Sequence, residues 1–110
     1  MKNIIVVTGG AGFVGTNLVS FLLKKSKYKI LSIDNYSSGS KKNHIKDEKI
    51  NYIKGNTKDI SKILNSKKNK INAIFHFGEF SRIYQSFLNM GECIESNSVG
   101  SHAVFNFCLN

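Results

Sequence analysis

Hydrophobic residues along the chain gather into short runs that are separated by longer segments of mixed polarity. Residues 3–8 (NIIVVT) form a nearly continuous apolar run, which is typical of a strand buried on both faces of a parallel sheet. Residues 29–34 (KILSID), 50–54 (INYIK) and 72–77 (NAIFHF) are also predicted to be strands.

The segments between these runs carry apolar residues at helical spacing. One helix is predicted from residue 13 to about residue 25, where Lys24 and Lys25 suit the negative end of a helix dipole. A short helix is predicted over residues 59–66 and a long one over residues 92–109. The apolar positions that define these helices are Val14, Leu18, Phe21 and Leu22 in the first, Ile60, Ile63 and Leu64 in the second, and Ile94, Val99, Val104 and Phe105 in the third.

Strands and helices therefore alternate four times along the chain. This alternation predicts an α/β fold, a Rossmann-type doubly wound parallel sheet with right-handed crossovers. In the usual strand order of such a sheet, strands three, two, one and four are present and the strands beyond the fourth are missing. With 110 residues, the chain is long enough for a single domain, residues 1–110.

A glycine-rich turn joins the first strand to the first helix. Gly10-x-Gly12-x-x-Gly15 fits the general dinucleotide fingerprint, and Gly9-x-x-Gly12-x-x-Gly15 fits a second spacing at the same time. Glycines allow a tight turn and close approach to a phosphate, and the N–H groups and dipole of the helix favour negative charge there. Glycine-rich turns also occur for structural reasons alone, so the position of the turn between strand and helix is what strengthens the interpretation.

A carboxylate stands where a ribose ligand would need one. Asp34 ends the second strand, 19 residues after Gly15, where it can accept hydrogen bonds from an adenosine ribose. An acid at this position repels a 2′-phosphate, which favours NAD over NADP. The alternative is that Asp34 is a strand-end residue that starts a turn with Asn35.

Five motifs in order resemble one known family. TGGAGFVG (residues 8–15), DNYSSG (34–39), GNTKD (55–59), HFGEFSR (76–82) and NSVGS (97–101) are similar to the extended short-chain dehydrogenase/reductases, specifically the NAD-dependent sugar-nucleotide epimerases and dehydratases. The resemblance covers essentially the whole chain and implies NAD as cofactor.

The resemblance also implies roles for individual residues. The pyrophosphate would be held by the turn, the adenosine ribose by the end of the second strand and the loop after it, and the adenine by the end of the third strand. The nicotinamide ribose would lie near the end of the fourth strand, and one asparagine in the last motif would help to order the site. In that order the implied residues are Gly9, Gly12, Phe13, Val14 and Gly15; Asp34, Asn35, Ser38 and Gly39; Asn56 and Thr57; Phe77, Gly78 and Ser81; and Asn97.

The sequence departs from the family at two positions. Asn56 stands where the family usually has aspartate; it keeps an acceptor oxygen and adds a donor. Glu79 stands where a small residue is usual, and a carboxylate there is unfavourable near phosphates unless it points to substrate or solvent.

Other candidate residues have plainer explanations. His76 ends a buried strand and is expected to be a packed, hydrogen-bonded residue rather than a base. No group of His, Cys, Asp or Glu has metal-ligand spacing, so no metal is expected. Core and loop packing is expected for Phe75, Phe77, Phe80 and Phe87, and a solvated turn for Lys67, Lys68 and Lys70.

The formal charge of +9 raises the alternative of a polyanion partner. Arg82 is the only arginine, however, and nucleic-acid readers favour arginine for bidentate contacts. We therefore expect a lysine-solvated surface, with a basic nucleic-acid binder as the less favoured alternative. Cys93 and Cys108 form no redox or metal motif, and no apolar run approaches transmembrane length, which predicts a cytoplasmic protein with no membrane partner.

One expected element is missing from the sequence. Family enzymes use a tyrosine base with a lysine four residues later, and none of the four tyrosines of this chain has that lysine. The residues thus predict the N-terminal, NAD-binding part of an enzyme whose catalytic and substrate-binding part, with its nucleotide-sugar substrate, is absent. The alternative is a split subunit or a non-catalytic NAD-responsive module that associates through the open edge of its sheet.

Overall fold

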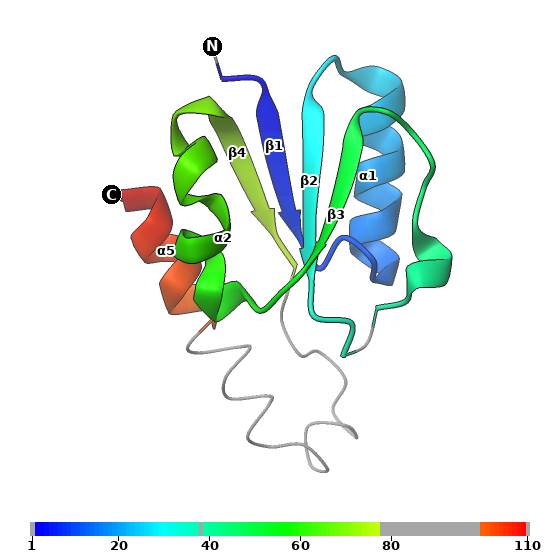
Figure 1. The fold of residues 1–110 in the computed structure, drawn as a ribbon. Helices are drawn as coiled ribbons and strands as arrows, with labels where there is room; N and C mark the ends of the chain where they lie inside the picture. The colour runs from blue at the N-terminus through cyan, green and yellow to red at the C-terminus, as the bar shows by residue number, and fades with distance from the viewer. Residues whose placement is uncertain (1, 38, 78–99, 110) are drawn as a thin grey trace.

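The computed structural model of the protein describes residues 2–37, 39–77 and 100–109. Within these ranges, four strands form one parallel sheet in the order β3-β2-β1-β4 (Figure 1). This order confirms the predicted Rossmann-type α/β sheet, and each strand begins and ends within about one residue of its predicted bounds. The strands are β1 (Ile4–Thr8), β2 (Lys29–Asp34), β3 (Ile50–Lys54) and β4 (Ile71–His76).

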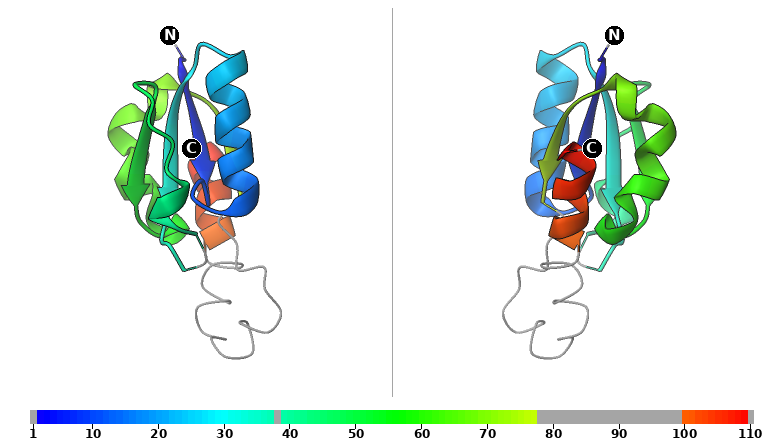
Figure 2. Two further views of the ribbon diagram at one scale, coloured as in Figure 1. Left: turned by 90° about the vertical axis from the view of Figure 1, so that its right-hand side faces the viewer. Right: turned by 90° about the vertical axis from the view of Figure 1, so that its left-hand side faces the viewer.

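Helices lie on both sides of this sheet. Figure 2 shows α1 (Phe13–Lys25) and α2 (Ile60–Leu64) on opposite sides, as a doubly wound sheet requires. Short 3₁₀ turns, η2 (Thr57–Asp59) and η3 (Asn65–Lys70), extend α2 at both ends, so only part of the helix predicted over residues 59–66 is α-helical. The last helix, α5 (Ser101–Leu109), packs beside α2, and residues 92–99 of its predicted span lie outside the described residues.

Alternate side chains of the strands pack into two hydrophobic clusters, one on each face of the sheet. Val6 and Ile33 face the cluster shared with α2 and α5, whereas Val7 and Ile30 face the cluster shared with α1. All five residues of β1 are buried, as expected for a central strand covered on both faces. The apolar run NIIVVT is therefore explained by its place between two layers.

The buried face of α1 agrees with the predicted one only in part: Leu22 is buried and Leu18 packs partly buried against the core, as predicted. Val14 and Phe21 are more than half exposed, and the buried residues of the helix are Gly15, Val19, Leu22 and Leu23. Both sets recur at helical spacing, because α1 carries apolar residues on more than one flank. Gly15 determines which flank is buried. Because it has no side chain, its face of the helix can approach the turn after β1 most closely.

The packing of α5 also needs correction. Val104 is buried as predicted, but Phe105 is 65% exposed and Phe107 takes its place in the core. The ammonium of Lys68 lies 4.8 Å from the centre of the Phe107 ring, a cation–π contact. Lys68 is therefore more than a solvated turn residue.

One face of β4 is poorly covered. Phe75 and Phe77 are 37% and 41% exposed, so the prediction that they serve core and loop packing is wrong within the described structure. Among the described residues, β4 pairs with β1 alone and forms the edge of the sheet. No helix in the described ranges is both long and apolar enough to cross a membrane.

Candidate functional site

The predicted site residues that the structure describes meet at the carboxyl edge of the sheet. Because all four strands are parallel and closely registered, Thr8 lies beside Ile33 and His76, and Asp34 lies beside Lys54. The glycine-rich turn follows β1, and the loops after β2 and β3 start at the same edge (Figure 1). Ligands of open α/β sheets bind outside this edge, where the chain connections diverge to the two faces.

The turn after β1 requires glycine at two positions for different reasons. Gly9 has a φ of 72°, in the left-handed region that favours glycine, and its carbonyl accepts the Gly12 N–H at 3.1 Å. At Gly15 a Cβ would overlap the Gly9 carbonyl oxygen and lie 2.8 Å from the Gly10 Cα. The first turn of α1 therefore packs directly on the backbone that leads into it.

The N-terminus of α1 is open to an anion. Gly12 occupies the N-cap position, so no side chain there accepts from the first N–H groups, and the first turn contains no acidic residue. The side chains of Phe13 and Val14 are 80% and 56% exposed, which leaves them outside the core. Unpaired N–H groups and the positive end of the helix dipole favour a phosphate at this position.

Asp34 is buried and bonded to the turn. Its Oδ2 accepts the Ala11 N–H at 3.0 Å, and its Oδ1 accepts the Tyr36 N–H at 2.7 Å. A carboxylate has about four lone-pair directions, so each oxygen keeps capacity for a further donor such as a ribose hydroxyl. Asp34 thus starts a turn, as its plainer explanation required, and also lies beside the glycine-rich turn.

Asn35, expected at the adenosine ribose, is hydrogen-bonded to Asn56, expected at the adenine. Asn35 Nδ2 donates to Asn56 Oδ1 at 2.9 Å, which links the loops after β2 and β3, and Asn35 Oδ1 accepts the Ser37 N–H at 2.9 Å. Asn56 precedes η2, whose first residue, Thr57, is buried. The amide of Asn56 therefore orients a neighbouring loop, in addition to any contact with a base.

The remaining predicted residues divide into two groups. Gly39 packs against the site, because a Cβ there would lie 2.7 Å from Asp34 Oδ2 and 3.0 Å from the Ala11 carbonyl carbon. The Phe77 N–H donates to the Thr8 carbonyl at 3.0 Å, which extends the pairing of β4 with β1. The others, and Glu79, lie outside the described residues: Ser38, Gly78, Ser81 and Asn97.

His76 is hydrogen-bonded through both ring nitrogens. Its Nδ1 lies 2.6 Å from Thr8 Oγ1, and its Nε2 lies 3.0 Å from Ser101 Oγ. These contacts join β1, β4 and α5, which agrees with the expected packed residue. Among the described residues, no cluster of His, Cys, Asp or Glu is arranged to hold a metal ion.

Sequence reasoning missed several residues around the turn. A Cβ at Gly10 would lie 2.7 Å from the Cβ of Ser32, a buried residue of β2 whose hydroxyl has no hydrogen-bond partner in the described structure. The Ala11 carbonyl accepts hydrogen bonds from Ser40 and Asn43. No local signal marks these residues, because their roles depend on contacts with distant segments.

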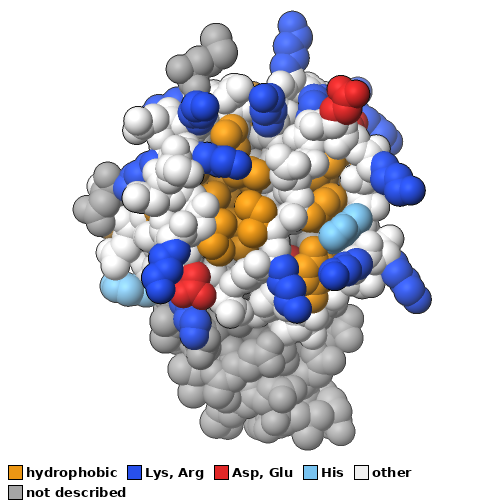
Figure 3. All heavy atoms as spheres, in the orientation of Figure 1, with side chains coloured by type: hydrophobic (Ala, Val, Ile, Leu, Met, Phe, Trp, Pro, Cys, Tyr) orange, Lys and Arg blue, Asp and Glu red, His pale blue; other side chains and the backbone are white. Residues whose placement is uncertain are grey.

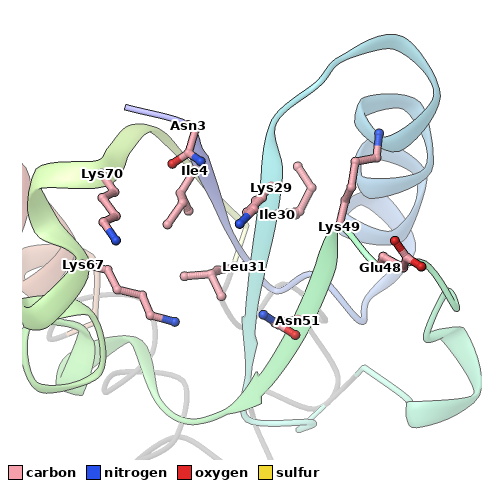
Figure 4. A pocket seen from close by; sticks show the side chains of 10 residues that line it. All are labelled: Asn3, Ile4, Lys29, Ile30, Leu31, Glu48, Lys49, Asn51, Lys67 and Lys70. Atoms are coloured by element: carbon pink, nitrogen blue, oxygen red, sulfur yellow. The ribbon is translucent and has the colours of Figure 1, made fainter. Parts of the chain in front are cut away.

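A separate hollow lies near the amino ends of the strands. It has a volume of about 270 Å³ and an apolar floor that includes Ile4 and Leu31, and lysines contribute to its rim (Figure 4). Figure 3 shows this face, where apolar side chains lie in the middle and lysines around them. The ammonium of Lys49, one of the lysines that line the hollow, donates to the Leu23 and Ser26 carbonyls at the end of α1. None of the predicted cofactor residues lines this hollow.

The sheet and the turn together define a class of protein. A parallel sheet of order 3-2-1-4, with a glycine-rich turn between the first strand and the first helix, is the arrangement of dinucleotide-binding α/β domains. A model of the NAD dependent epimerase/dehydratase family matches residues 5–110. The chain therefore belongs to the NAD-dependent epimerase/dehydratase family.

Individual relatives agree with this assignment. The chain is similar to dTDP-D-glucose 4,6-dehydratase of Dictyostelium discoideum, at 32% identity over 112 residues, which covers 96% of this chain and 26% of the dehydratase. Among solved structures it is similar to the epimerase Mth375 of Methanothermobacter thermautotrophicus, with a TM-score of 0.85, 28% identity, and 97% of this chain matched to 32% of that one. It is also similar to UDP-N-acetylglucosamine 4-epimerase of Methanobrevibacter ruminantium M1, with a TM-score of 0.80, 30% identity, and coverage of 98% and 34%. The chain thus spans about a third or less of the length of these relatives.

Proposed function

We propose that this chain is the NAD-binding portion of a sugar-nucleotide epimerase or dehydratase. The observation that carries the proposal is the hydrogen bond from the Ala11 N–H to Asp34 Oδ2, which joins the turn before α1 to the acid at the end of β2. A single unit then presents both an anion-binding helix end and a ribose-binding carboxylate. Membership of an NAD-dependent family supports the same ligand.

The residues of the site would divide the dinucleotide between them. The backbone from Gly12 to Gly15 would bind the pyrophosphate, because no side chain caps the start of the helix and glycine lets the backbone come close. Asp34 would accept from the adenosine ribose, and its negative charge would disfavour the 2′-phosphate of NADP. Asn35 would lie at the adenosine ribose beside Asp34, and Asn56, which accepts a hydrogen bond from Asn35, would border the adenine.

The chemistry of the reaction requires more than this chain contains. NAD supplies hydride acceptance and return when it is bound to an enzyme of this family. The tyrosine and lysine pair that would move the proton is absent from the sequence, so we assign this chain binding and orientation of the cofactor. A nucleotide sugar is the proposed substrate of the complete enzyme, because two of the relatives named above, the dTDP-D-glucose dehydratase and the UDP-N-acetylglucosamine epimerase, are named for nucleotide sugars.

Calorimetry with NAD, ADP-ribose and NADP tests the proposal. We expect the 110-residue chain to bind NAD and ADP-ribose with a dissociation constant of about 1 mM or lower, which corresponds to about −4 kcal/mol, and to bind NADP more weakly. Asp34→Asn removes the negative charge but keeps an acceptor oxygen, so it should reduce the difference in affinity between NAD and NADP. Asp47→Asn, at an exposed aspartate that accepts the Lys49 N–H, is the matched control. A chain that is folded by circular dichroism but gives no heat and no thermal stabilisation at several millimolar NAD would contradict the proposal.

A second function is favoured by the exposed side of β4. We propose, as the alternative, a non-catalytic module whose β4 edge binds another polypeptide in a manner that responds to NAD. The support is that Phe75 of β4, and Phe77 just after it, are partly exposed, and that β4 pairs on one side only within the described residues. Parallel strands are normally covered on both faces and paired on both edges unless they end the sheet.

A further inference from the structure

We propose that Asn43 is a positioning residue that holds the glycine-rich turn in its phosphate-binding shape. The Asn43 Nδ2 donates to the Ala11 carbonyl at 2.7 Å, across 32 residues of sequence. The same carbonyl accepts the Ser40 N–H at 3.1 Å. The inference rests on the proposed function, since it concerns how the chain would bind a diphosphate.

Ala11 is the point at which the turn is fixed. Its N–H donates to Asp34 Oδ2 at 3.0 Å, while its carbonyl accepts from Ser40 and Asn43, so polar groups on both sides of this fully buried residue are bonded. Glycines lie on both sides of Ala11, and glycine backbones adopt many conformations. Without bonds to the loop after β2, this stretch would have to be ordered when the ligand binds.

Asn43 is itself held by a supported segment. It ends the 3₁₀ turn η1 (Lys41–Asn43), in which its N–H donates to the Ser40 carbonyl at 3.0 Å and the Ser40 Oγ accepts the Lys42 N–H at 3.1 Å. The next residue, His44, lies with Nε2 2.6 Å from the Tyr36 hydroxyl.

An aromatic stack fixes this segment to the sheet. The His44 ring stacks on Tyr52 of β3, with ring centres 3.8 Å apart and planes 8° from parallel. The Tyr52 hydroxyl in turn accepts the Ile45 N–H at 2.9 Å. The support for Asn43 therefore runs from β3 through the stack, and we call residues 40–45 the brace.

The brace acts through preorganisation rather than through contact with the ligand. A turn that already has its binding shape loses less conformational entropy on binding, which is how a rigid site gains affinity. One neutral hydrogen bond contributes about 1 kcal/mol net, so loss of the Asn43 bond should weaken binding of a diphosphate about fivefold. Adenosine lacks the pyrophosphate, and its binding should change less than twofold.

Asn43→Ala tests the inference in the 110-residue chain. Asn43 is exposed, so the variant should not leave a core cavity and is expected to fold. Asn69→Ala is the matched control. Asn69 is also exposed, but it lies in η3, away from the glycine-rich turn that precedes α1. In calorimetry, Asn43→Ala should lower the affinity for ADP-ribose about fivefold, and Asn69→Ala should not. The affinity for adenosine should change little in either variant.

A second measurement does not depend on ligand binding. Amide hydrogen exchange of Ala11 and Gly12 in the free protein should accelerate about fivefold in Asn43→Ala, while the amides of β1 keep their rates. Failure of the parent chain to bind ADP-ribose would reject the proposed function, and the exchange rates would still decide whether Asn43 orders the turn. Unchanged exchange at Ala11 and Gly12 would overturn the inference, as would ADP-ribose affinity within twofold of the parent when the parent binds.

Discussion

Asp34 joins two parts of the candidate site that are 23 residues apart in the chain. Each of its carboxylate oxygens accepts one backbone N–H, from Ala11 and from Tyr36, and hydrogen bonds to a charged acceptor are stronger than neutral ones. The acid was expected to bind a ribose, and the structure gives it a structural role as well. A substitution that removes its acceptors should therefore affect folding of the turn in addition to ligand specificity.

The sequence did not indicate the unusual environment of Tyr36. Its φ of 63° is unusual for a residue with a side chain, and its hydroxyl lies 2.6 Å from His44 Nε2. Burial raises the pKa of the Tyr36 phenol, and the negative charge of Asp34 and the neighbouring Tyr52 raise it further.

This shift predicts a dependence of stability on pH. Because the folded pKa is raised above the unfolded value of about 10, the contribution of the neutral phenol is fully present below pH 10 and is lost as the pH rises through the folded pKa. The free energy of unfolding in urea, measured from pH 8 to pH 11, should fall more steeply in the parent than in Tyr36→Phe. Tyr28→Phe serves as the control for loss of a phenol, and equal slopes for the parent and Tyr36→Phe would contradict the prediction.

Contacts between elements decide how closely the turn, the strands and the helices approach. Gly10, in the turn after β1, lies over Ser32 of β2 so closely that a Cβ would lie 2.7 Å from the Ser32 Cβ. The Ser32 hydroxyl is buried without a hydrogen-bond partner in the described structure, which is an unfavourable arrangement. Close approach of backbone and strand thus fixes the residue types at both positions.

A pair of substitutions tests this contact. Gly10→Ala should lower the free energy of unfolding by about 2 kcal/mol, because overpacking a filled interior forces neighbours to move. Ser32→Gly removes both atoms that the new methyl group would meet, and it should recover about 1 kcal/mol or more in the double variant beyond the sum of the single effects. Ser32→Ala removes the Oγ but keeps the Cβ, so it should rescue Gly10→Ala less than Ser32→Gly does, which makes it the comparison variant. Strict additivity of Gly10→Ala and Ser32→Gly in urea unfolding would show that the contact does not matter.

The predicted elements and their packed faces differ in how well the sequence specifies them. The four strands are short apolar runs bounded by polar or glycine residues, so their type and limits follow from composition. The buried face of α1 does not, because the exposed Val14 and Phe21 fit helical spacing as well as the buried Val19 and Leu23 do. Only the position of the sheet decides which flank is covered, and Gly15 marks that flank by its contact with Gly9.

The residues of the candidate site also divide into those that the local sequence indicates and those that depend on distant contacts. Gly9, Gly12, Gly15 and Asp34 could be predicted because their chemistry is local: a tight turn, a helix end and an acid at a strand end. Asn43 could not, because its partner Ala11 is 32 residues away and nothing in the sequence KKNHI indicates that contact. Contacts that cross between loops require the three-dimensional arrangement of the sheet.

The uncovered side of β4 gives a prediction about association. If this surface binds another polypeptide or a second copy, sedimentation velocity over a range of concentrations should detect a larger species, with and without NAD. Phe75→Glu should weaken that association, because it places a charge on the partly exposed face of the edge strand. Phe105→Glu, at an exposed position of α5, is the matched control. The alternative would be rejected if the chain stayed monomeric at millimolar concentration and bound no polypeptide that completes its sheet.

The central position of β1 also has a consequence during synthesis. Thr8 lies 2.6 Å from His76 in the neighbouring strand, although 68 residues separate them in the chain. A ribosome adds roughly 5 to 20 residues per second, so β1 would wait roughly 3 to 14 seconds for the strand that covers its second edge. During that interval a nascent chain exposes an apolar strand to solvent, which is the kind of segment that chaperones protect from aggregation.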